Sequence, residues 1–592
     1  MASTTVPGAT SLQLHRGADA LALLCSPPFQ RQWSALLDAC PWGTSMQYPE
    51  FVIPWYSSYE DVYEPLTIHQ FAPDGDLSGL LLLAVNKAAG SIACAGTHHA
   101  EYQAWLATPG DQRFIGSALK KLCDLGFDRL QFRYIPSGAP LTWLKEGKHR
   151  WDRRSDLRAV RKPLMQLDSP AEIQKSLKKK SNKSRINRLQ RDGALEFHQL
   201  GEPQELDQVA EDLVLFTDFR QGALHGSCPF RDDKRKYSFY RKLMHSPKLL
   251  HVTVMRAGQK LVSAHVGMAN RREVSLGILA HSPIAAEHSP GKIHLLYLGL
   301  LLSQQGFAAL DLTPGGDPYK DRFATHYDEA HLLTVFLSRD AWLRHLALSG
   351  CIAAGKRIAK YVHVNPQELI TKLAAVKYKV RRDGFVRSSK SLLCSAVRCL
   401  WTRTEIRFYR MPAFEARQRV RDDSVRESSL ADLLCYEPVE AWQPSKQAFL
   451  NEAMSRIEKG VRVYSCSVDG VLAQYGWATI GPGKAYVPEV HCDFEYPPKS
   501  AVLSDHYTHP TFRGRGLGAS CLARMLHDIG GIEDLEYVYA SVRADDAEVR
   551  SIVENAGFQF QACIVRRKRF GSTQVVFTGN LGHSPTAHTE PT

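Results

Sequence analysis

The stretch "THPTFRGRGLG", Thr508 to Gly518, decides the fold of the C-terminal region. The residues after it, "ASCLARMLHDIGG", carry apolar side chains at helical spacing, which predicts an amphipathic helix that begins at the glycines. The residues before it, "SAVLSDHYTH" (Ser500–His509), are rich in β-formers and stop at Pro510, as is typical of a strand. A strand, a glycine loop and a helix start favour an anion site, because the first helical N–H groups are unpaired and partly positive.

The order of the predicted elements around this stretch occurs twice in the chain. Residues 166–346 contain a strand, helices, three strands, a helix with Ser289 as N-cap and Pro290 at its first position, and a further strand. Basic helices are predicted for residues 347–400, and residues 401–580 repeat the same order. Residues 11–165 mix helices and strands, and residues 581–592 form a flexible tail. The expected fold class is α/β (α+β), with mixed sheets flanked by helices.

Length and composition indicate a globular protein of several domains. The chain has 592 residues, of which 44% are hydrophobic and 23% charged. Its longest apolar runs, Leu77–Val85 and Leu295–Leu302, are shorter than the roughly 20 residues that span a bilayer. The first residues lack a signal-peptide pattern, and the 13 cysteines lack metal-like spacing. We therefore expect a cytoplasmic protein with reduced thiols, no transmembrane segment and no metal site.

Positive charge is concentrated in two stretches of the sequence. Lys175–Arg191 holds eight Lys and Arg and no acidic residue, and Lys356–Arg410 holds fourteen against three acids. Such a run is often only a solvated helix face. It is also suited to an anionic partner, for which a phosphorylated substrate, a lipid surface and RNA stay open as alternatives.

The glycine loop resembles the acyl-CoA loop of the GNAT acetyltransferase superfamily, whose pattern is R/Q-x-x-G-x-G/A. The sequence "ENAGF" (Glu554–Phe558) resembles the turn that closes the family's domain. The resemblance implies a GNAT domain over residues 401–580 and acetyl-CoA, or another acyl-CoA, as cosubstrate. It also implies that the coenzyme's diphosphate is bound by backbone N–H groups of Arg513, Gly514, Arg515, Gly516, Leu517 and Gly518.

The middle of the chain, Pro41 to Leu346, resembles the CelD/BcsL-like acetyltransferases of cellulose and exopolysaccharide biosynthesis. These are related to the FemAB aminoacyltransferases and contain two GNAT-like halves, which implies halves at 11–165 and 166–346. Three places carry the likeness: "KKSNKSRINRLQRDGALEFHQL", "GTHHAEYQAWLATPG", and the segment with Asp311, Gly315, Tyr319 and Lys320. This region lacks R-x-x-G-x-G, so a phosphate site here would depend on Ser289, Gly291 and Lys292.

A GNAT reaction needs a neutral amine, which attacks the thioester. An alkylammonium group has a pKa near 10.4, so a base or desolvation must release the amine. The candidate bases are Glu489, Asp505 and His506, of which Glu489 and Asp505 are preferred. Strand alternation predicts Asp505 and Tyr507 on one face and His506 on the other.

The general acid that protonates the leaving thiolate is not given by the family pattern. Val553 occupies the position where the family usually has a tyrosine. Tyr507, Tyr537, Tyr539 or a water molecule are the candidates for that role.

The predicted function is acyl-CoA-dependent N-acyl transfer to an amine of a sugar, a peptide or a small metabolite. An exopolysaccharide link rests on the middle region alone. The alternatives are a FemAB-like aminoacyl transfer from charged tRNA and a non-catalytic acyl-CoA-binding module. The sequence does not decide the acceptor, the acyl length or the oligomeric state.

Overall fold

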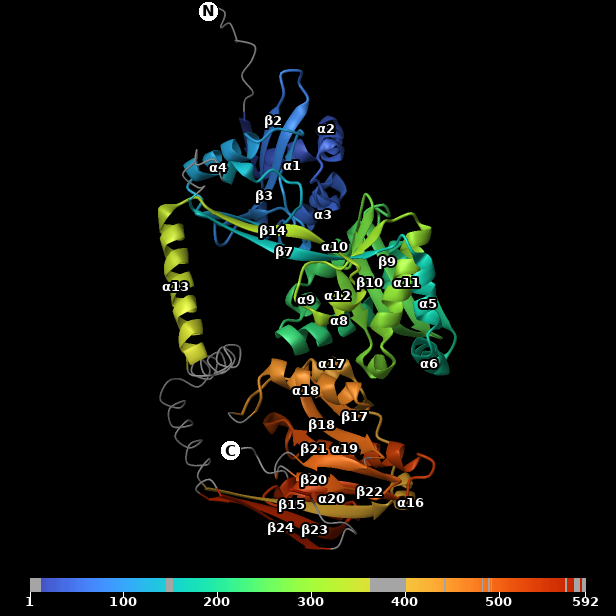
Figure 1. Cartoon of the computed structure of the whole chain (residues 1–592). Helices are drawn as coiled ribbons and strands as arrows, with labels where there is room; N and C mark the ends of the chain where they lie inside the picture. Colours follow the sequence, from blue (N-terminus) through green and yellow to red (C-terminus); the bar gives the residue numbers. More distant parts are fainter. Residues whose placement is uncertain are drawn as a thin grey trace, which may run out of the picture. The chain divides into compact units, whose positions relative to one another are not determined.

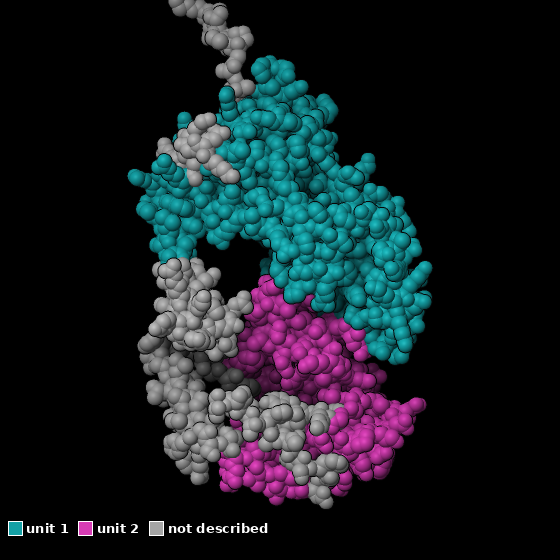
Figure 2. All heavy atoms as spheres, viewed as in Figure 1, with its two compact units in different colours: residues 1–217, 229–282, 288–362 teal, residues 218–228, 283–287, 363–592 magenta. Residues whose placement is uncertain are grey.

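The computed structural model describes residues 12–144, 153–361, 401–440, 443–481, 483–487, 490, 492–569, 572–579 and 586–587. The chain divides into two compact units, coloured separately in Figure 2. Unit 1 comprises residues 1–217, 229–282 and 288–362, and unit 2 comprises residues 218–228, 283–287 and 363–592. Both units contain mixed sheets flanked by helices (Figure 1), which confirms the predicted fold class.

The first sheet of unit 1 has the order β1-β2-β3-β4, with β5 also paired to β3. Its strands are β1 (Leu12–Arg16), β2 (Tyr63–Phe71), β3 (Leu77–Asn86), β4 (Ile92–Cys94) and β5 (Leu106–Ala107). The accompanying helices are α1 (Gly17–Leu24), α2 (Pro27–Ala39), α3 (Pro49–Ser58) and α4 (Phe114–Asp124). The apolar run Leu77–Val85 is buried β3, a length that suits a buried strand and not a membrane span.

The second sheet of unit 1 has the order β6-β14-β7-β13-β11-β10-β9-β8, with β12 also paired to β10. Its strands are β6 (Arg129–Pro136), β7 (Ser155–Gln166), β8 (Leu195–Leu200), β9 (Leu250–Ala257), β10 (Lys260–Asn270), β11 (Glu273–Ser275), β12 (Ile278–His281), β13 (Ala309–Asp311) and β14 (His326–Phe336). Strand β6 and all of β7 except its last residue, Gln166, belong to the first predicted half, yet both strands pair with β14. The two predicted halves thus share a sheet, and their division at 165/166 stays a proposal.

Helix α11 (Pro290–Gln304) packs against this second sheet through an apolar cluster that includes Leu298, Leu302 and Leu310. As predicted, Ser289 is its N-cap residue and Pro290 its first residue, but the Ser289 side chain makes no cap hydrogen bond. The other helices are α5 (Pro170–Lys178), α6 (Lys180–Leu189), α7 (Pro203–Asp207), α8 (Ala210–His225), α9 (Pro229–Asp232), α10 (Arg235–Leu243), α12 (Pro318–Phe323) and α13 (Arg339–Tyr361).

Unit 2 is built on a sheet of order β16-β17-β18-β21-β22-β15-β23-β24. Its strands are β15 (Trp401–Pro412), β16 (Arg426–Glu427), β17 (Arg462–Val468), β18 (Val471–Ile480), β21 (Ser500–Thr508), β22 (Tyr537–Arg543), β23 (Gln559–Arg569) and β24 (Ser572–Gly579). A smaller sheet joins β19 (Lys484–Val487), β20 (Cys492–Glu495) and β25 (Thr586–Ala587). The helices are α16 (Ala413–Arg417), α17 (Leu430–Leu433), α18 (Lys446–Glu458), α19 (Leu517–Gly530) and α20 (Ala547–Asn555).

Both faces of the main sheet of unit 2 are covered. On one face α19 packs through Leu522, Met525 and Ile529, which are all buried. On the other face Phe408 and Phe494 stack with their ring centroids 4.6 Å apart. The strands in the middle of the sheet are therefore buried on both sides, which explains their apolar runs.

Two predictions reach beyond the described residues. The predicted connector 347–400 begins inside α13, and residues 362–400 lie outside the described part of the chain. So does most of the second basic stretch, Lys356–Arg410. Among the helices that are described, none combines the length and the apolarity needed to cross a membrane.

Candidate active site

Strands β21 and β22 run parallel for only part of their length. Their pairing joins Ser500–Leu503 to Tyr537–Ala540. Strand β21 then continues to Thr508 and β22 to Arg543, and these described continuations are not paired with each other. The main-chain groups on the diverging edges can therefore bond to an extended ligand, as they would to an added strand.

A β-bulge lies at the point where the two strands diverge. Between the pairs Tyr475–Tyr507 and Trp477–Ser504, strand β18 has one residue, Gly476, and β21 has two, Asp505 and His506. Asp505 has a left-handed backbone with φ of 49°. A Cβ on Gly476 would lie 2.9 Å from His506 Nδ1, so the glycine makes room for the bulged residue.

A cavity of about 1430 Å³ lies along the divergence. Helix α18, strands β18, β21 and β22, and the loop before α19 all contribute to its wall, with Arg456, Trp477, Asp505, His506, Tyr507 and Gly518 among the lining residues. This exceeds the roughly 300–1,000 Å³ of ordinary small-molecule pockets. The cavity has room for a coenzyme together with an acceptor.

The loop of residues 513–518 leads directly into α19, whose N-cap is Gly516. Gly514 and Gly516 have φ of 76° and 79°, and a Cβ on either would meet no atom within 4 Å. Among the described residues, the N–H groups of 514–518 find no protein acceptor. The first turn of a 14-residue helix therefore presents unpaired donors to open space.

The two arginines of the loop differ in their surroundings. Arg513 donates to Glu440 across 3.2 Å and also lines the cavity. Arg515 is exposed, and its guanidinium carbon lies 5.1 Å from the ring centre of Phe512. Its charge is thus not neutralised by an ion pair among the described residues and is available to an anionic ligand.

The predicted base Asp505 lines the cavity and is ion-paired with Arg456. Arg456 also donates to Glu452 across 2.8 Å and lies over Trp477 at 5.2 Å. The pairing fixes the carboxylate but occupies one of its oxygens, so Asp505 is a less accessible base than the sequence suggested. The other preferred base, Glu489, lies outside the described residues.

His506 also lines the cavity, and the bulge at Asp505 and His506 interrupts the strand alternation on which the predicted faces of Asp505, His506 and Tyr507 depended. Burial lowers the pKa of its imidazole to about 4, so the ring is neutral near pH 7. Its Nε2 is buried and has no hydrogen-bond partner among the described residues. His506 thus offers an unoccupied acceptor or donor nitrogen at the cavity wall.

Of the three tyrosines considered as the acid, Tyr507 alone lines the cavity. Its hydroxyl accepts a hydrogen bond from Gln443 across 2.6 Å, and burial raises its pKa. Tyr539 is buried in the cluster on the other face of the sheet, and Tyr537 packs beside that cluster and under Arg410. Val553 is buried at the cavity wall and supplies no proton.

One group of side chains in unit 1 has the composition of a metal site. Ligand atoms of His98, His99 and Asp233 lie within 4.8 Å of one another. The Tyr59 hydroxyl already bridges two of them, donating to Asp233 across 2.6 Å and lying 3.0 Å from His99 Nε2. Burial lowers the pKa of His99 to about 2, and Lys236 contributes to that shift. A bound cation would have to displace the Tyr59 hydroxyl and would be repelled by the positive charge of Lys236.

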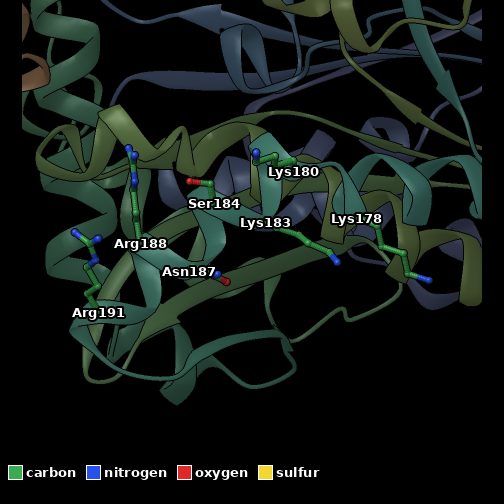
Figure 3. A pocket seen from close by; sticks show the side chains of 7 residues that line it. All are labelled: Lys178, Lys180, Lys183, Ser184, Asn187, Arg188 and Arg191. Carbon is green, nitrogen blue, oxygen red and sulfur yellow. The ribbon is translucent and has the colours of Figure 1, made fainter.

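The first basic stretch forms a hollow on α5 and α6 of unit 1 (Figure 3). The hollow has a volume of about 640 Å³ and is lined by Lys178, Lys180, Lys183, Ser184, Asn187, Arg188 and Arg191. In the described part of the chain, none of these five cationic side chains is paired with an acid. Unpaired like charges repel each other, so the hollow is suited to an anionic ligand.

One family model matches the chain, the one described as "Acetyltransferase (GNAT) domain", over residues 176–321. The matched segment lies in the second predicted half of the N-terminal region and not in residues 401–580. The resemblance of this part to GNAT acetyltransferases is thereby confirmed. No curated protein matches the chain.

Several solved structures are similar to parts of the chain. FemX is 10% identical, covers 51% of this chain and 95% of its own, and has a TM-score of 0.37. L-PGS from Bacillus licheniformis is 12% identical, with coverages of 53% and 93% and a TM-score of 0.34. A tandem GNAT protein from the clavulanic acid biosynthesis pathway is 12% identical, with coverages of 62% and 95% and a TM-score of 0.20.

Proposed function

We propose that unit 2 transfers an acyl group from an acyl-CoA to an amine, in a chain whose residues 176–321 match the family model described as "Acetyltransferase (GNAT) domain". The observation that carries the proposal is the divergence of β21 and β22, with the 513–518 loop at its edge. An acyl-CoA consists of an extended pantetheine arm joined to a diphosphate. The unpaired strand edge suits the arm, and the unpaired amides of the loop suit the diphosphate.

The residues of unit 2 supply positioning and proton transfer. A base removes a proton from the acceptor's ammonium group and releases it to solvent, the amine nitrogen bonds to the thioester carbon, and the carbon–sulfur bond breaks. The nitrogen loses its second proton, which replaces the one given to the leaving thiolate, so the products are the amide and the free thiol. Asp505 and His506 at the cavity, and Glu489 outside the described residues, are the candidate bases. Tyr507 is the candidate donor of a proton to the leaving thiolate. Holding amine and thioester in one cavity converts a bimolecular reaction into an effectively unimolecular one.

The acceptor is proposed to be an amine of a sugar, a peptide or a small metabolite, and acetyl is the default acyl group. A role in exopolysaccharide synthesis and a cytoplasmic location are proposed from the middle-region resemblance and from the free cysteines. The basic hollow on α5 and α6 is proposed to hold an anionic partner, in the simplest case a phosphate group of the substrate.

Thermal unfolding with and without acetyl-CoA tests the donor site. A saturating coenzyme at ~100 times its Kd should add about 2.7 kcal/mol to the free energy of unfolding. For a domain of this size that is a rise of about 2–4 °C in Tm. Gly516→Val should abolish the shift, because its side chain fills the space above the loop amides.

Gly470→Val is the matched control. Gly470 has φ of 75° and open space around its Cβ position, as Gly516 does, but it lies in the β17–β18 turn and not at the cavity. Both substitutions therefore introduce similar backbone strain. Equal loss of the shift in both variants, or no shift in the wild-type protein, would contradict the donor site.

The alternative donor, an aminoacyl-tRNA, is tested at the basic hollow. It requires RNA binding whose affinity falls steeply with salt concentration. Lys180→Glu with Lys183→Glu should abolish that binding if the hollow is the contact. RNA binding without any response to acetyl-CoA would favour the aminoacyl-tRNA reaction, and a response to acetyl-CoA without RNA binding would exclude it. A response to acetyl-CoA without turnover of any amine would favour the non-catalytic module.

A further inference from the structure

Gln443 lies on the segment between α17 and α18 and contacts the candidate proton donor of unit 2. Its side chain is buried, with 9% of the residue exposed. Its Nε2 donates a hydrogen bond to the Tyr507 hydroxyl oxygen across 2.6 Å. Tyr507 lines the cavity, and Gln443 does not. Any effect of Gln443 on a ligand in the cavity is therefore transmitted through Tyr507.

Hydrogen bonds from the main chain fix the orientation of the Gln443 amide. Its Oε1 accepts from the N–H of Val439 across 2.6 Å and from the N–H of Glu440 across 2.8 Å. Both of these partners can only donate, so the side-chain oxygen has to face them and the NH₂ group has to face Tyr507. A flipped amide would place donors against donors. The backbone thus decides the direction of the bond to Tyr507.

The direction of this bond limits what the Tyr507 hydroxyl can do. A hydroxyl both donates and accepts, and Gln443 occupies only an acceptor position of the oxygen. Because the NH₂ group cannot accept a proton, the proton of Tyr507 is directed to a group other than Gln443. Burial raises the pKa of Tyr507, and the bond from Gln443 acts in the opposite direction, since it favours the ionised oxygen.

The segment that carries Gln443 also contacts the glycine loop. Glu440, whose N–H bonds to Gln443, accepts through its carboxylate from Arg513 across 3.2 Å. Arg513 is the first residue of the 513–518 loop. On the other side of Gln443, the Ser445 side chain caps α18. The position of the Gln443 amide is therefore fixed relative to both the proton donor and the proposed diphosphate site.

The simplest alternative is that Gln443 only closes its own loop. The two bonds to Oε1 would be sufficient for that role, and a carboxylate would accept the same two N–H groups at least as well. Loop closure makes no use of the NH₂ group, which bonds to a tyrosine at the cavity instead. A substitution that keeps the loop bonds and removes the NH₂ group therefore distinguishes the two roles.

We propose that Gln443 is a positioning residue for acyl transfer, which holds the Tyr507 hydroxyl with its proton directed to the leaving thiolate. The inference rests on the proposed function, in which Tyr507 is the candidate acid. As the carbon–sulfur bond breaks, the proton moves from the Tyr507 oxygen to the sulfur, and the Gln443 N–H stabilises the tyrosinate. The second proton lost by the amine nitrogen restores the hydroxyl.

Gln443→Glu in the full chain tests this role. The new carboxylate still accepts from the N–H groups of Val439 and Glu440, so Tm and its rise with acetyl-CoA should be retained. It accepts the Tyr507 proton instead of donating to the oxygen, so kcat should fall by about 10- to 100-fold with KM for acetyl-CoA little changed.

Release of CoA from acetyl-CoA measures the rate, with hydroxylamine as the acceptor. Hydroxylamine is small and largely neutral near pH 7, so its attack does not depend on the unidentified base. Gln418→Glu is the matched control, because Gln418 is exposed and lies outside the cavity wall, and it makes the same change of charge. This control should retain the wild-type kcat.

A double-mutant cycle separates positioning from loop closure and from added charge. In a Tyr507→Phe background, Gln443→Glu should change kcat by less than about twofold, because the proton that it redirects is absent. Gln443→Met, which removes the NH₂ group without adding charge, should be equally non-additive even where its Tm falls.

Two results would overturn the inference alone: a wild-type kcat in Gln443→Glu, or losses that multiply in the double variant. Full activity of Tyr507→Phe, or a wild-type protein that does not respond to acetyl-CoA, would overturn the proposed function as well. The two failures are therefore distinguishable.

Discussion

Units 1 and 2 use the same backbone arrangement with different chemistry. In unit 2 strand β21, a member of the parallel pair, has two residues, Asp505 and His506, opposite the single residue Gly476 of the neighbouring strand β18. In unit 1 strand β10 pairs with β11 at Ala269–Val274 and with β12 at Val266–Ile278. Between these two pairs, β10 has two residues, Gly267 and Met268, and the segment that joins β11 to β12 has three, residues 275–277. Each unit thus contains a one-residue bulge facing a glycine, next to a pair of parallel strands that diverges (β11 with β13 in unit 1, β21 with β22 in unit 2), and each is followed by a helix.

The contents of the two divergences differ. In unit 2 the helix begins with the glycine loop and the cavity is about 1430 Å³, whereas in unit 1 the helix begins at Ser289 and Pro290 and the neighbouring cavity is about 250 Å³ with buried carboxylates. The backbone creates the opening, and the side chains around it decide which ligand it can hold. Fold similarity between the units therefore does not imply a common ligand.

The largest expected effect concerns the proton donor of unit 2. Tyr507→Phe removes the only one of the three candidate tyrosine hydroxyls at the cavity, so kcat for acyl transfer should fall by about 10²–10⁴-fold with KM little changed. Tyr475→Phe is the control, because Tyr475 lines the same cavity with its ring centre 5.3 Å from that of Tyr507. Steady-state kinetics with an amine acceptor makes the measurement, and equal losses in both variants would reject the role.

The next prediction compares the two bulge glycines. A Cβ on Gly267 would lie 1.9 Å from the Ser275 carbonyl oxygen, which is main chain and cannot move alone, whereas a Cβ on Gly476 meets a histidine ring. Gly267→Ala should therefore destabilise unit 1 by about 3 kcal/mol or more, and Gly476→Ala should cost about 1 kcal/mol. Urea unfolding of both variants gives the difference. Similar costs in the two variants would contradict the predicted difference in packing around the two glycines.

The sequence predicted the regular parts of this arrangement well. Strand β21 and the start of α19 lie where β-formers, Pro510 and the glycine spacing indicated. These features are local, since each depends on residues close together in the chain. The order of helices and strands in the two units could also be predicted, because the spacing of apolar residues distinguishes a helix from a strand.

The sequence did not predict the features that depend on pairing between distant residues. The bulge at Asp505 follows from the register with Gly476, and the ion pair of Asp505 joins it to Arg456 on α18. A cluster in unit 1 combines Glu101 and Tyr102 with Asp311, more than 200 residues apart in sequence. Asp311 and Lys320 were marked by their motif and Glu101 lies in the quoted stretch "GTHHAEYQAWLATPG", but the sequence does not reveal that this loop lies beside Asp311.

A smaller effect is expected from Glu101, with a defined pH dependence. Its pKa is raised to about 7 by burial and by Asp311, while Arg133 and Lys320 act in the opposite direction. Tyr240 lies close enough for Glu101 to raise that tyrosine's pKa. A carboxyl with a raised folded pKa contributes stability below its unfolded pKa and loses it as the pH rises toward 7.

Glu101→Gln removes the cost of ionising this group. The variant should be more stable than the wild-type protein at pH 8, by about 1 kcal/mol after allowance for solvent screening, and the difference should shrink at pH 5. Urea unfolding at the two pH values gives the difference. A loss of stability at both would instead identify Glu101 as a structural hydrogen-bonding residue and weaken the contrast drawn between the units.

The smallest effect compares the charges at the two helix starts. Arg515 precedes α19 and is exposed without an acidic partner in the described residues, so Arg515→Gln should weaken acetyl-CoA binding two- to fivefold, about 0.5–1 kcal/mol, at low salt. Lys292 occupies the first turn of α11 in unit 1, where the nearby cations Arg185, Lys179 and Arg322 act with burial to lower its pKa. Lys292→Gln should leave acetyl-CoA affinity unchanged.

Titration calorimetry of Arg515→Gln and Lys292→Gln at two salt concentrations shows whether a loss of acetyl-CoA affinity comes from the lost charge or from a changed shape of the site. The loss in Arg515→Gln should nearly vanish at about 1 M salt, where the Debye length falls to about 3 Å. Arg513→Gln should have a smaller effect than Arg515→Gln, because Glu440 already neutralises that guanidinium. A comparable loss in Lys292→Gln would mean that the helix start of unit 1 also holds a coenzyme phosphate, and the two units would then share a ligand as well as a backbone arrangement.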